Sequence, residues 1–102
     1  MVLIELSMSP MDKGASVSTW VARSLEIIDR SGLAYRLGPM GTCIEGEWDE
    51  VMAVVRKCWN RMAKDSVRIT FSIKGDWRRG AKGRLDSKVS KVETLVKRKL
   101  CT

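Results

Sequence analysis

The chain turns back on itself within residues 35–48, which read Tyr35-Arg-Leu-Gly-Pro-Met-Gly-Thr-Cys-Ile-Glu-Gly-Glu-Trp48. Gly38, Pro39 and Gly41 lie between two short runs of strand-forming residues. Proline lacks a backbone N–H and fixes φ, whereas glycine permits positive φ, so this cluster is typical of a tight turn. The stretch therefore predicts a β-hairpin.

The two strands of this hairpin are expected at residues 34–37 and 42–47, and a helix is expected from Trp48. Because side chains alternate along a strand, Glu45 and Glu47 would share one face of the second strand. Two carboxylates on one strand face are a poor basis for a core. They indicate instead a place that could hold a cation.

Two further strands and two further helices are predicted around the hairpin. Apolar and polar residues alternate over residues 2–9 and 67–74, which is typical of half-buried strands. One helix should follow Ser16 as its N-cap. The other should begin near Leu85, after a loop of glycines and cations at residues 75–83.

Apolar residues at spacings of three and four predict which helix faces are buried. In the helix from Trp48 to Met62, this stripe includes both of these end residues and also Cys58 and Trp59. We expect these four side chains in the core. In the last helix we expect an inward-facing stripe made of Leu85, Val89, Val92, Val96 and Leu100.

The order of these elements, β-α-β-β-α-β followed by a helix, predicts an α+β fold of the ferredoxin-like type. Such a fold has a four-stranded antiparallel sheet with two helices on one face. The length of 102 residues suits one domain, residues 1–102, with a single core. The apolar strand positions should face the helices. The open sheet face, where function is expected, should show Leu3, Glu5, Ser7, Cys43, Glu45, Glu47, Arg68, Thr70 and Ser72, with Tyr35 as a further candidate.

The composition argues against most catalytic and metal sites. The chain has no histidine, which removes Cys-His and Ser-His dyads and the commonest transition-metal ligand. Three scattered cysteines do not make a zinc site, and they suit reduced thiols in the cytoplasm. Acylphosphatase-like chemistry would need an arginine in the loop after the first strand, where only Lys13 is present. We therefore expect a cytoplasmic protein without catalytic residues, metal or cofactor, and without a membrane span or signal peptide.

The net charge of +7 lies entirely in the C-terminal part of the chain. Residues 1–73 hold nine Lys/Arg and nine Asp/Glu, whereas residues 74–102 hold ten Lys/Arg and three Asp/Glu. A solvated basic helix explains this distribution, and so does a surface that binds anions or nucleic acid.

Several runs of the sequence resemble the small thiamine-binding protein family, and the resemblance covers nearly the whole chain. The most specific run is Pro39-Met-Gly-Thr-Cys-Ile-Glu-Gly-Glu47. It is accompanied by Ser16-Val-Ser18, Val21-Ala22, Ser31-Gly-Leu-Ala-Tyr-Arg-Leu37, Trp48-Asp-Glu-Val-Met52, Val67-Arg-Ile-Thr70 and Lys88-Val89.

The resemblance implies a ferredoxin-like fold, homodimers or homotetramers assembled through the sheets, and binding of thiamine or a related pyrimidine without catalysis. We hypothesise that the carboxylate of Glu5, Glu45 or Glu47 balances the charge of the thiazolium cation. Hydroxyls that could bind the aminopyrimidine are those of Ser7, Ser18, Thr42 and Thr70, and Tyr35 or Trp20 could offer a ring face.

Two loops depart from the family pattern. Where the family has an acidic segment after the fourth strand, this chain reads Ile73-Lys-Gly-Asp-Trp-Arg-Arg79, and the loop at residues 10–14 differs as well. Arg78, Arg79 and Lys82, together with Lys74, would favour an anionic group. A phosphorylated thiamine is therefore an alternative ligand.

A nucleic-acid-binding module is the alternative from another class, because RNA-recognition domains share the β-α-β-β-α-β order. Those domains stack bases on aromatic residues of the two central strands. The corresponding positions here offer no ring, since they are Leu3, Glu5, Ser7, Cys43, Glu45 and Glu47. Binding would have to come from phosphate contacts of the C-terminal segment.

Overall fold

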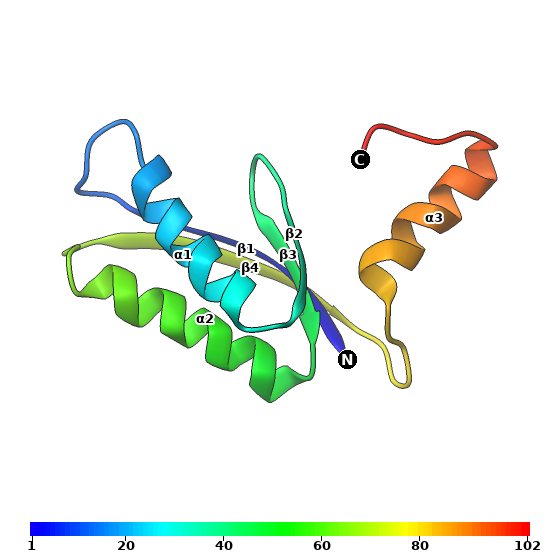
Figure 1. Ribbon diagram of the computed structural model, residues 1–102, viewed down its shortest axis with the longest axis horizontal. Helices are drawn as coiled ribbons and strands as arrows, with labels where there is room; N and C mark the ends of the chain where they lie inside the picture. The colour runs from blue at the N-terminus through cyan, green and yellow to red at the C-terminus, as the bar shows by residue number, and fades with distance from the viewer.

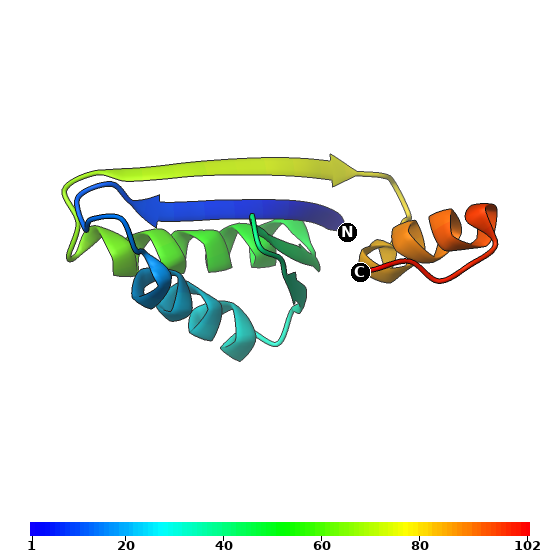
Figure 2. The same cartoon turned by 90° about the horizontal axis from the view of Figure 1, so that it is seen from above.

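The computed structural model describes residues 1–102 and contains four strands and three helices (Figure 1). In chain order these are β1 (Val2–Pro10), α1 (Ser18–Arg30), β2 (Ala34–Leu37), β3 (Thr42–Gly46), α2 (Trp48–Ala63), β4 (Ile69–Trp77) and α3 (Arg84–Val96). The strands form one sheet in the order β2-β3-β1-β4, and every neighbouring pair is antiparallel. Helices α1 and α2 lie on the same face of the sheet (Figure 2). The predicted ferredoxin-like arrangement is confirmed.

The core lies between the sheet and these two helices. Alternate residues of β1 point into it, as the period of two predicts: Val2, Ile4, Leu6 and Met8 are all buried. They pack with Ile28 of α1, Ile44 of β3 and the inward stripe of α2, which consists of Val51, Val54, Cys58 and Met62. The hydrophobic period therefore places β1 at the centre of the molecule.

Strand β4 runs past its predicted end. Residues 75–77 were expected in a loop, but they continue the antiparallel pairing, and Trp77 lies opposite Val2. The first residues of β1 provide a free strand edge for this pairing. Gly75 is accommodated there opposite Ile4. The turn signal of a single glycine is therefore overridden by the available partner strand.

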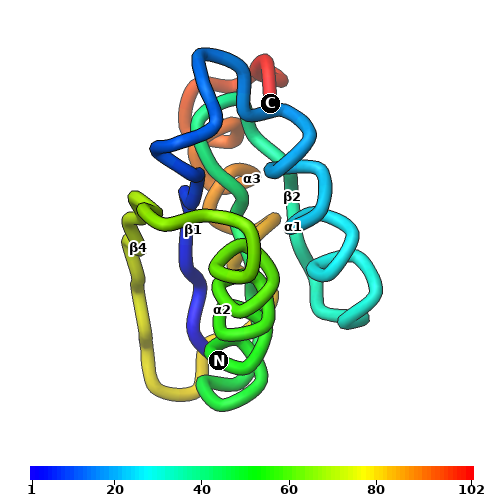
Figure 3. The backbone as a smooth tube through the Cα atoms, turned by 90° about the vertical axis from the view of Figure 1, so that its left-hand side faces the viewer, coloured from blue at the N-terminus to red at the C-terminus, as the bar shows by residue number.

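Phe71 and Ile73 of β4 point toward the helix side, but no helix covers them, whereas Ile69 packs against the core. Phe71 lies opposite Met8 and Ile73 opposite Leu6, so these pairs share one face of the sheet. Phe71 is nevertheless 58% exposed and Ile73 40% exposed. The reason is that β4 forms the outer edge of the sheet (Figure 3). The predicted direction of these side chains is correct, and their predicted burial is wrong.

The predicted burial of two tryptophans is also wrong. Trp48 is 60% exposed and Trp59 is 47% exposed, whereas Cys58 is fully buried. The tryptophans belong to the flank of the apolar stripe of α2, not to its centre. At the start of α1, Val17 occupies the N-cap position in place of the predicted Ser16, and no side chain caps the helix.

Helix α3 buries none of its residues, so its predicted inward stripe is wrong. The helix lies beyond the end of the sheet, apart from α1 and α2 (Figures 1 and 2). Val92 is 49% exposed and Val96 is 44% exposed. An amphipathic pattern predicts a buried face only where another element is available to cover it.

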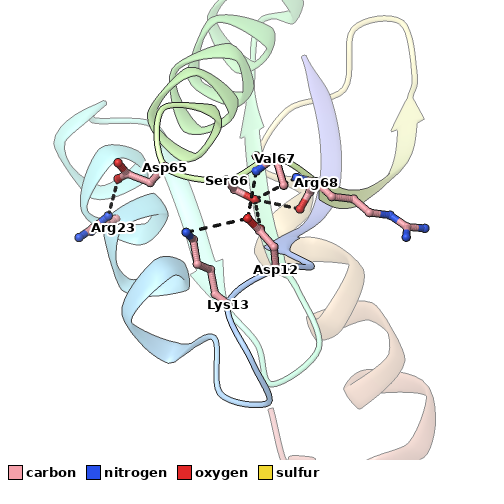
Figure 4. A network of polar contacts seen from close by, with 7 residues as sticks. All are labelled: Asp12, Lys13, Arg23, Asp65, Ser66, Val67 and Arg68. Carbon is pink, nitrogen blue, oxygen red and sulfur yellow. Dashed lines mark hydrogen bonds and ion pairs between the residues drawn. The ribbon is translucent and has the colours of Figure 1, made fainter.

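Hydrogen bonds around Asp12 join the end of β1 to the beginning of β4 (Figure 4). The carboxylate of Asp12 accepts hydrogen bonds from the Ser66 hydroxyl and from the N–H of Val67, the latter at 3.1 Å. The N–H of Met11 donates to the carbonyl of Arg68 at 2.7 Å. The Ser66 hydroxyl, followed by the Val67 N–H, lowers the pKa of Asp12 below its ordinary value of 3.8.

We predict that Asp12→Ala lowers the thermal unfolding midpoint at neutral pH, because it removes both hydrogen bonds. The pKa of Asp12 is lower in the folded than in the unfolded chain. Its charge therefore stabilises the fold above the ordinary pKa, and this stabilisation is lost as the pH falls through the folded pKa. Circular dichroism melts should show a smaller difference between wild type and variant at about pH 3 than at about pH 7.

Asp49→Ala is the matched control, because Asp49 is an exposed carboxylate that accepts no side-chain hydrogen bond from another residue. It should change the midpoint less than Asp12→Ala at neutral pH. Equal effects of the two variants at both pH values would contradict a specific role for Asp12.

Candidate ligand-binding site

A cavity of about 260 Å³ opens between α1, the second half of β1 and the turn of the β2–β3 hairpin. Its apolar walls come from the core side of β1 and from α1, including Leu6, Met8, Val21, Leu25 and Ile28. The turn residues 38–41 form the opposite wall. Small-molecule sites typically have such an apolar lining with a few polar groups that fix the orientation of the ligand.

The cavity exists because β1 is longer than its pairing with β3. Strand β3 pairs with β1 only between Val2 and Leu6, whereas β4 pairs with β1 as far as Pro10. Residues 7–9 of β1 therefore have a strand on one side only, and they line the cavity. Their free edge carries backbone N–H and C=O groups that can bind a polar ligand.

Two buried residues that carry hydroxyls also line this cavity. Ser24 of α1 is 7% exposed and Thr42 of β3 is 4% exposed. Neither hydroxyl takes part in an intramolecular hydrogen bond, although the backbone carbonyl of Ser24 accepts one from the Cys58 thiol at 3.7 Å. Neither hydroxyl oxygen is fully enclosed, so each reaches the cavity and can form a hydrogen bond with a ligand or water there. These two groups therefore mark the polar end of the site.

Gly41 brings the hairpin turn close to β1. A Cβ at this position would lie 3.0 Å from Cγ of Glu5 and 3.2 Å from the carbonyl oxygen of Leu6. The side chain of Glu5 consequently packs against a residue that lines the cavity. The exposed side of the turn carries Met40, which is 85% exposed and stands at the mouth of the cavity with Leu37.

The residues predicted from the sequence as ligand-binding do not all lie at this cavity. Ser7 and Thr42 line it. Thr70 is exposed on β4 opposite Ser9, and Ser18 is an exposed residue at the start of α1.

Tyr35 lies on the helix side of the sheet and not on the open face. It pairs with the buried Ile44, and its hydroxyl donates a hydrogen bond to Asp29 of α1 at 2.7 Å. This hydrogen bond raises the pKa of Tyr35. The suggestion that Tyr35 joins the open face is therefore wrong, and Arg36, its neighbour, occupies the open face beside Cys43.

The predicted pair of carboxylates on one strand face is also wrong. Strand β3 ends at Gly46, and Glu47 is the exposed N-cap residue of α2. Gly46 is closely packed, since a Cβ there would lie 3.2 Å from side-chain atoms of both Leu33 and Val51. The chain leaves the sheet at this packed point, and Glu47 no longer alternates with Glu45.

Glu45 has a structural partner in the C-terminal helix. Its side chain is on the open face, opposite Leu3, and the residue is only 5% exposed. The carboxylate accepts hydrogen bonds from the backbone N–H groups of Arg84 at 2.8 Å and Leu85 at 3.3 Å. Glu45 therefore binds the N-terminus of α3, where a negative charge is favoured by the helix dipole.

Ion pairs complete the attachment of α3. Arg36 binds Asp86 at 2.5 Å, and Asp76 of β4 lies 2.6 Å from Lys88 and 2.9 Å from Arg84. The contact between Arg84 and Asp76 is an ion pair in which the nearest N–H does not point at the carboxylate. The pKa of Asp76 is lowered first by its hydrogen bond with Lys88.

A second, shallower cavity of about 200 Å³ lies between α3 and the open sheet face. Glu5, Cys43, Lys74, Asp76 and Lys88 line it, so it contains two carboxylates and two amines. Burial, followed by the charge of Glu5, raises the pKa of the Cys43 thiol. The charges of the two carboxylates and the two amines balance one another here. This cavity is therefore a weaker site for a cation than the sequence suggested.

Arg78, Arg79 and Lys82 follow the end of β4, opposite the first residue of β1. The hydroxyl-lined cavity lies at the other end of β1. At about 3.3 Å per residue, roughly 15–20 Å of strand separates the two places. Within one chain, these cations do not reach a ligand in that cavity.

Ser24 is the site residue that sequence reasoning missed. It interrupts the apolar stripe of α1, between Val21 and Ile28. A small polar residue on an otherwise apolar helix face is a usable signal, because burial of an unpaired hydroxyl is unfavourable.

The structure contains no group of three or more Cys, Asp or Glu residues placed to hold a metal ion. Separately, none of its helices combines the length and the apolar character that crossing a membrane requires.

Comparison with known proteins agrees with this architecture. The family model described as thiamine-binding protein matches residues 4–93. A UPF0045 protein of Synechocystis sp. is 36% identical over 96 residues, which is 93% of this chain and 79% of the relative. The solved structure of a hypothetical protein from Methanocaldococcus jannaschii has a TM-score of 0.83 and 30% identity, covering 89% of this chain and 94% of that one.

A second solved structure carries a functional name. The Thermotoga maritima protein, whose proposed role is thiamine biosynthesis or salvage, has a TM-score of 0.79 and 25% identity. The match covers 89% of this chain and 97% of that one. With the family model spanning most of the chain, the chain described here belongs to the thiamine-binding protein family.

Proposed function

We propose that this protein binds thiamine, through its aminopyrimidine half, in the cavity between α1 and the β2–β3 hairpin. The observation that carries the proposal is the pair of hydroxyls of the buried residues Ser24 and Thr42, which line the cavity, are not fully enclosed and have no intramolecular hydrogen bond. Membership of a family named for thiamine binding supports the class of ligand.

The polar groups of the cavity suit an aminopyrimidine. Such a ring has nitrogen atoms that accept hydrogen bonds and an exocyclic amine that donates them. A hydroxyl can do either, and the free edge of residues 7–9 offers both backbone donors and acceptors. The remaining lining is apolar and can cover the two faces of the ring.

We assign the thiazolium cation to the side of Glu5. The Glu5 side chain packs against Gly41 at the cavity wall, and Glu5 remains exposed to solvent. The carboxylate of Glu45 is engaged by the backbone of α3, and Glu47, at the N-cap position of α2, does not line the cavity. No residue that lines the cavity is cationic, so the site favours thiamine itself over its phosphate esters.

The proposed role is binding without catalysis. The cavity lining contains hydroxyls but no carboxylate, amine, guanidinium or thiol. A reaction on the ligand would need a group that can exchange a proton or attack a bond near neutral pH.

We further propose that copies of this chain assemble into a homo-oligomer. Strand β4 provides an interface, because its nine residues pair on one side only and its apolar Phe71 and Ile73 are exposed. Long apolar edge strands tend to pair with another strand. Pairing two β4 edges would form a homodimer, and further contact between open sheet faces would give a homotetramer.

We predict that Thr42→Val and Ser24→Ala each weaken thiamine binding by about tenfold, since each removes a hydrogen bond to a buried ligand. Isothermal titration calorimetry at physiological salt measures the change. Glu5→Gln should weaken binding of thiamine and leave binding of the uncharged pyrimidine half unchanged.

Thr70→Val is the matched control for the hydroxyl variants, because Thr70 is exposed on the open sheet face and should be neutral. Weaker binding by Thr70→Val, with Thr42→Val unchanged, would place the ligand on the open face and contradict our site. No heat from wild type with thiamine or its pyrimidine would contradict the function itself.

We also predict that Phe71→Ser combined with Ile73→Ser converts the protein from a dimer or tetramer to a smaller species, as measured by light scattering after size exclusion. The change removes apolar area that the edge pairing buries. The control is Ser72→Ala, on the other face of the same strand, which should retain the larger species. A wild-type protein that is monomeric at high micromolar concentration would refute this interface.

A further inference from the structure

The C-terminal segment carries more positive charge than its own contacts use. Residues 74–102 contain ten Lys/Arg and three Asp/Glu. All three acids already have partners: Asp76 binds Arg84 and Lys88, Asp86 binds Arg36, and the Glu93 carboxylate accepts the N–H of Leu100 at 2.7 Å. The remaining cations therefore face solvent without a counter-charge from this chain.

Six of the eight unpaired cations form two groups at the two ends of α3, whereas Lys74 lies apart from them in β4, at the second cavity. The loop cations, before the helix, are Arg78, Arg79 and Lys82. The C-terminal cations, after it, are Lys97, Arg98 and Lys99. All six are exposed and none takes part in an ion pair. Lys91, which is also exposed and unpaired, lies on the helix between them.

The spacing of the two groups suits an extended anion better than a small one. The helix of 13 residues separates them, which at 1.5 Å per residue is about 20 Å. One phosphate group could neutralise one end only. Along one strand of a duplex, where phosphates advance about 3.4 Å each, the same distance spans roughly six phosphates.

The position of α3 makes this surface accessible. The helix lies at the end of the sheet, away from α1 and α2 (Figures 1 and 2). Next to the loop cations, Trp77 is 56% exposed and the guanidinium of Arg79 lies 5.3 Å from its ring centre. An exposed ring beside cations can stack an unpaired base.

The chemistry of the helix favours a nucleic acid over a membrane surface. A helix that lies in a bilayer interface needs a broad apolar face with large or aromatic residues. Helix α3 contains no aromatic residue, and Leu85 and Val89 of its narrow apolar stripe are half-buried. The unpaired cations are concentrated at the ends of the helix and do not flank an apolar face.

We propose that the loop cations and the C-terminal cations together bind the phosphate backbone of single-stranded nucleic acid, without sequence specificity, with Trp77 stacking one base. This surface is separate from the hydroxyl-lined cavity at the other end of β1. The proposal therefore does not depend on the proposed ligand.

Fluorescence anisotropy with a labelled single-stranded RNA tests the proposal. An RNA of about 20 nucleotides is longer than the roughly 20 Å between the two groups. The logarithm of the association constant should fall linearly with the logarithm of the salt concentration. For six to seven phosphates neutralised the slope is about −4 to −5.

Changing all three loop cations to Gln, or all three C-terminal cations to Gln, should each reduce the steepness of this slope by about 2. Each change should also weaken RNA binding at low salt more than tenfold. Trp77→Ala should weaken binding and leave the slope unchanged.

The control is the triple variant R56Q/K57Q/K64Q, which removes the same charge from exposed, unpaired cations of α2 and the residue after it. It should retain most of the affinity and the slope. Circular dichroism establishes that each variant is folded. An equal loss of RNA affinity in the control variant would show that only net charge matters and would overturn the proposal. So would absence of RNA binding by wild type, including the case in which vesicles of phosphatidylcholine and phosphatidylserine bind instead.

Discussion

The candidate binding cavity depends on the unequal pairing of β1. Strand β3 stops pairing at Leu6 because the chain turns at residues 38–41, while β4 accompanies β1 as far as Pro10. The second half of β1 is thus held in place from one side and left open on the other. Helix α1 and the hairpin turn enclose this open edge. The tight turn therefore has two effects, since it forms the hairpin and also leaves a cavity with backbone hydrogen-bonding groups in its wall.

Strand periodicity and turn signals predicted the order of the elements, the antiparallel sheet and the buried face of β1, because these depend on local sequence. They did not predict which faces remain uncovered. Phe71 and Ile73 follow the pattern of a buried strand face, yet they lie on the outer edge of the sheet. The second half of the apolar stripe of α3 is uncovered for a related reason. Leu85 and Val89 are half-buried near the sheet, whereas Val92 and Val96 have no element against them. Coverage depends on the spatial arrangement of whole elements, which a periodic pattern does not contain.

The site was predicted only in part, for reasons that differ between residues. Ser7 and Thr42 were chosen as hydroxyls that could bind the aminopyrimidine, and both line the cavity. Glu45 was chosen for its charge, but its carboxylate binds the first N–H groups of α3, a contact between residues about 40 positions apart. Ser24 was overlooked because it lies within an apolar helical stripe. Long-range partners of charged groups and polar interruptions of apolar faces are visible only when the elements are assembled.

We propose that thiamine binds between α1 and the hairpin turn and not on the open sheet face. Titration of the ¹⁵N-labelled protein with thiamine, followed by the backbone amide resonances, tests it most directly. Binding in the cavity predicts that the largest shifts occur at residues 7–9, at residues 38–42 and around Ser24. Shifts confined to β4, Cys43 and the start of α3, with the cavity residues unchanged, would contradict it.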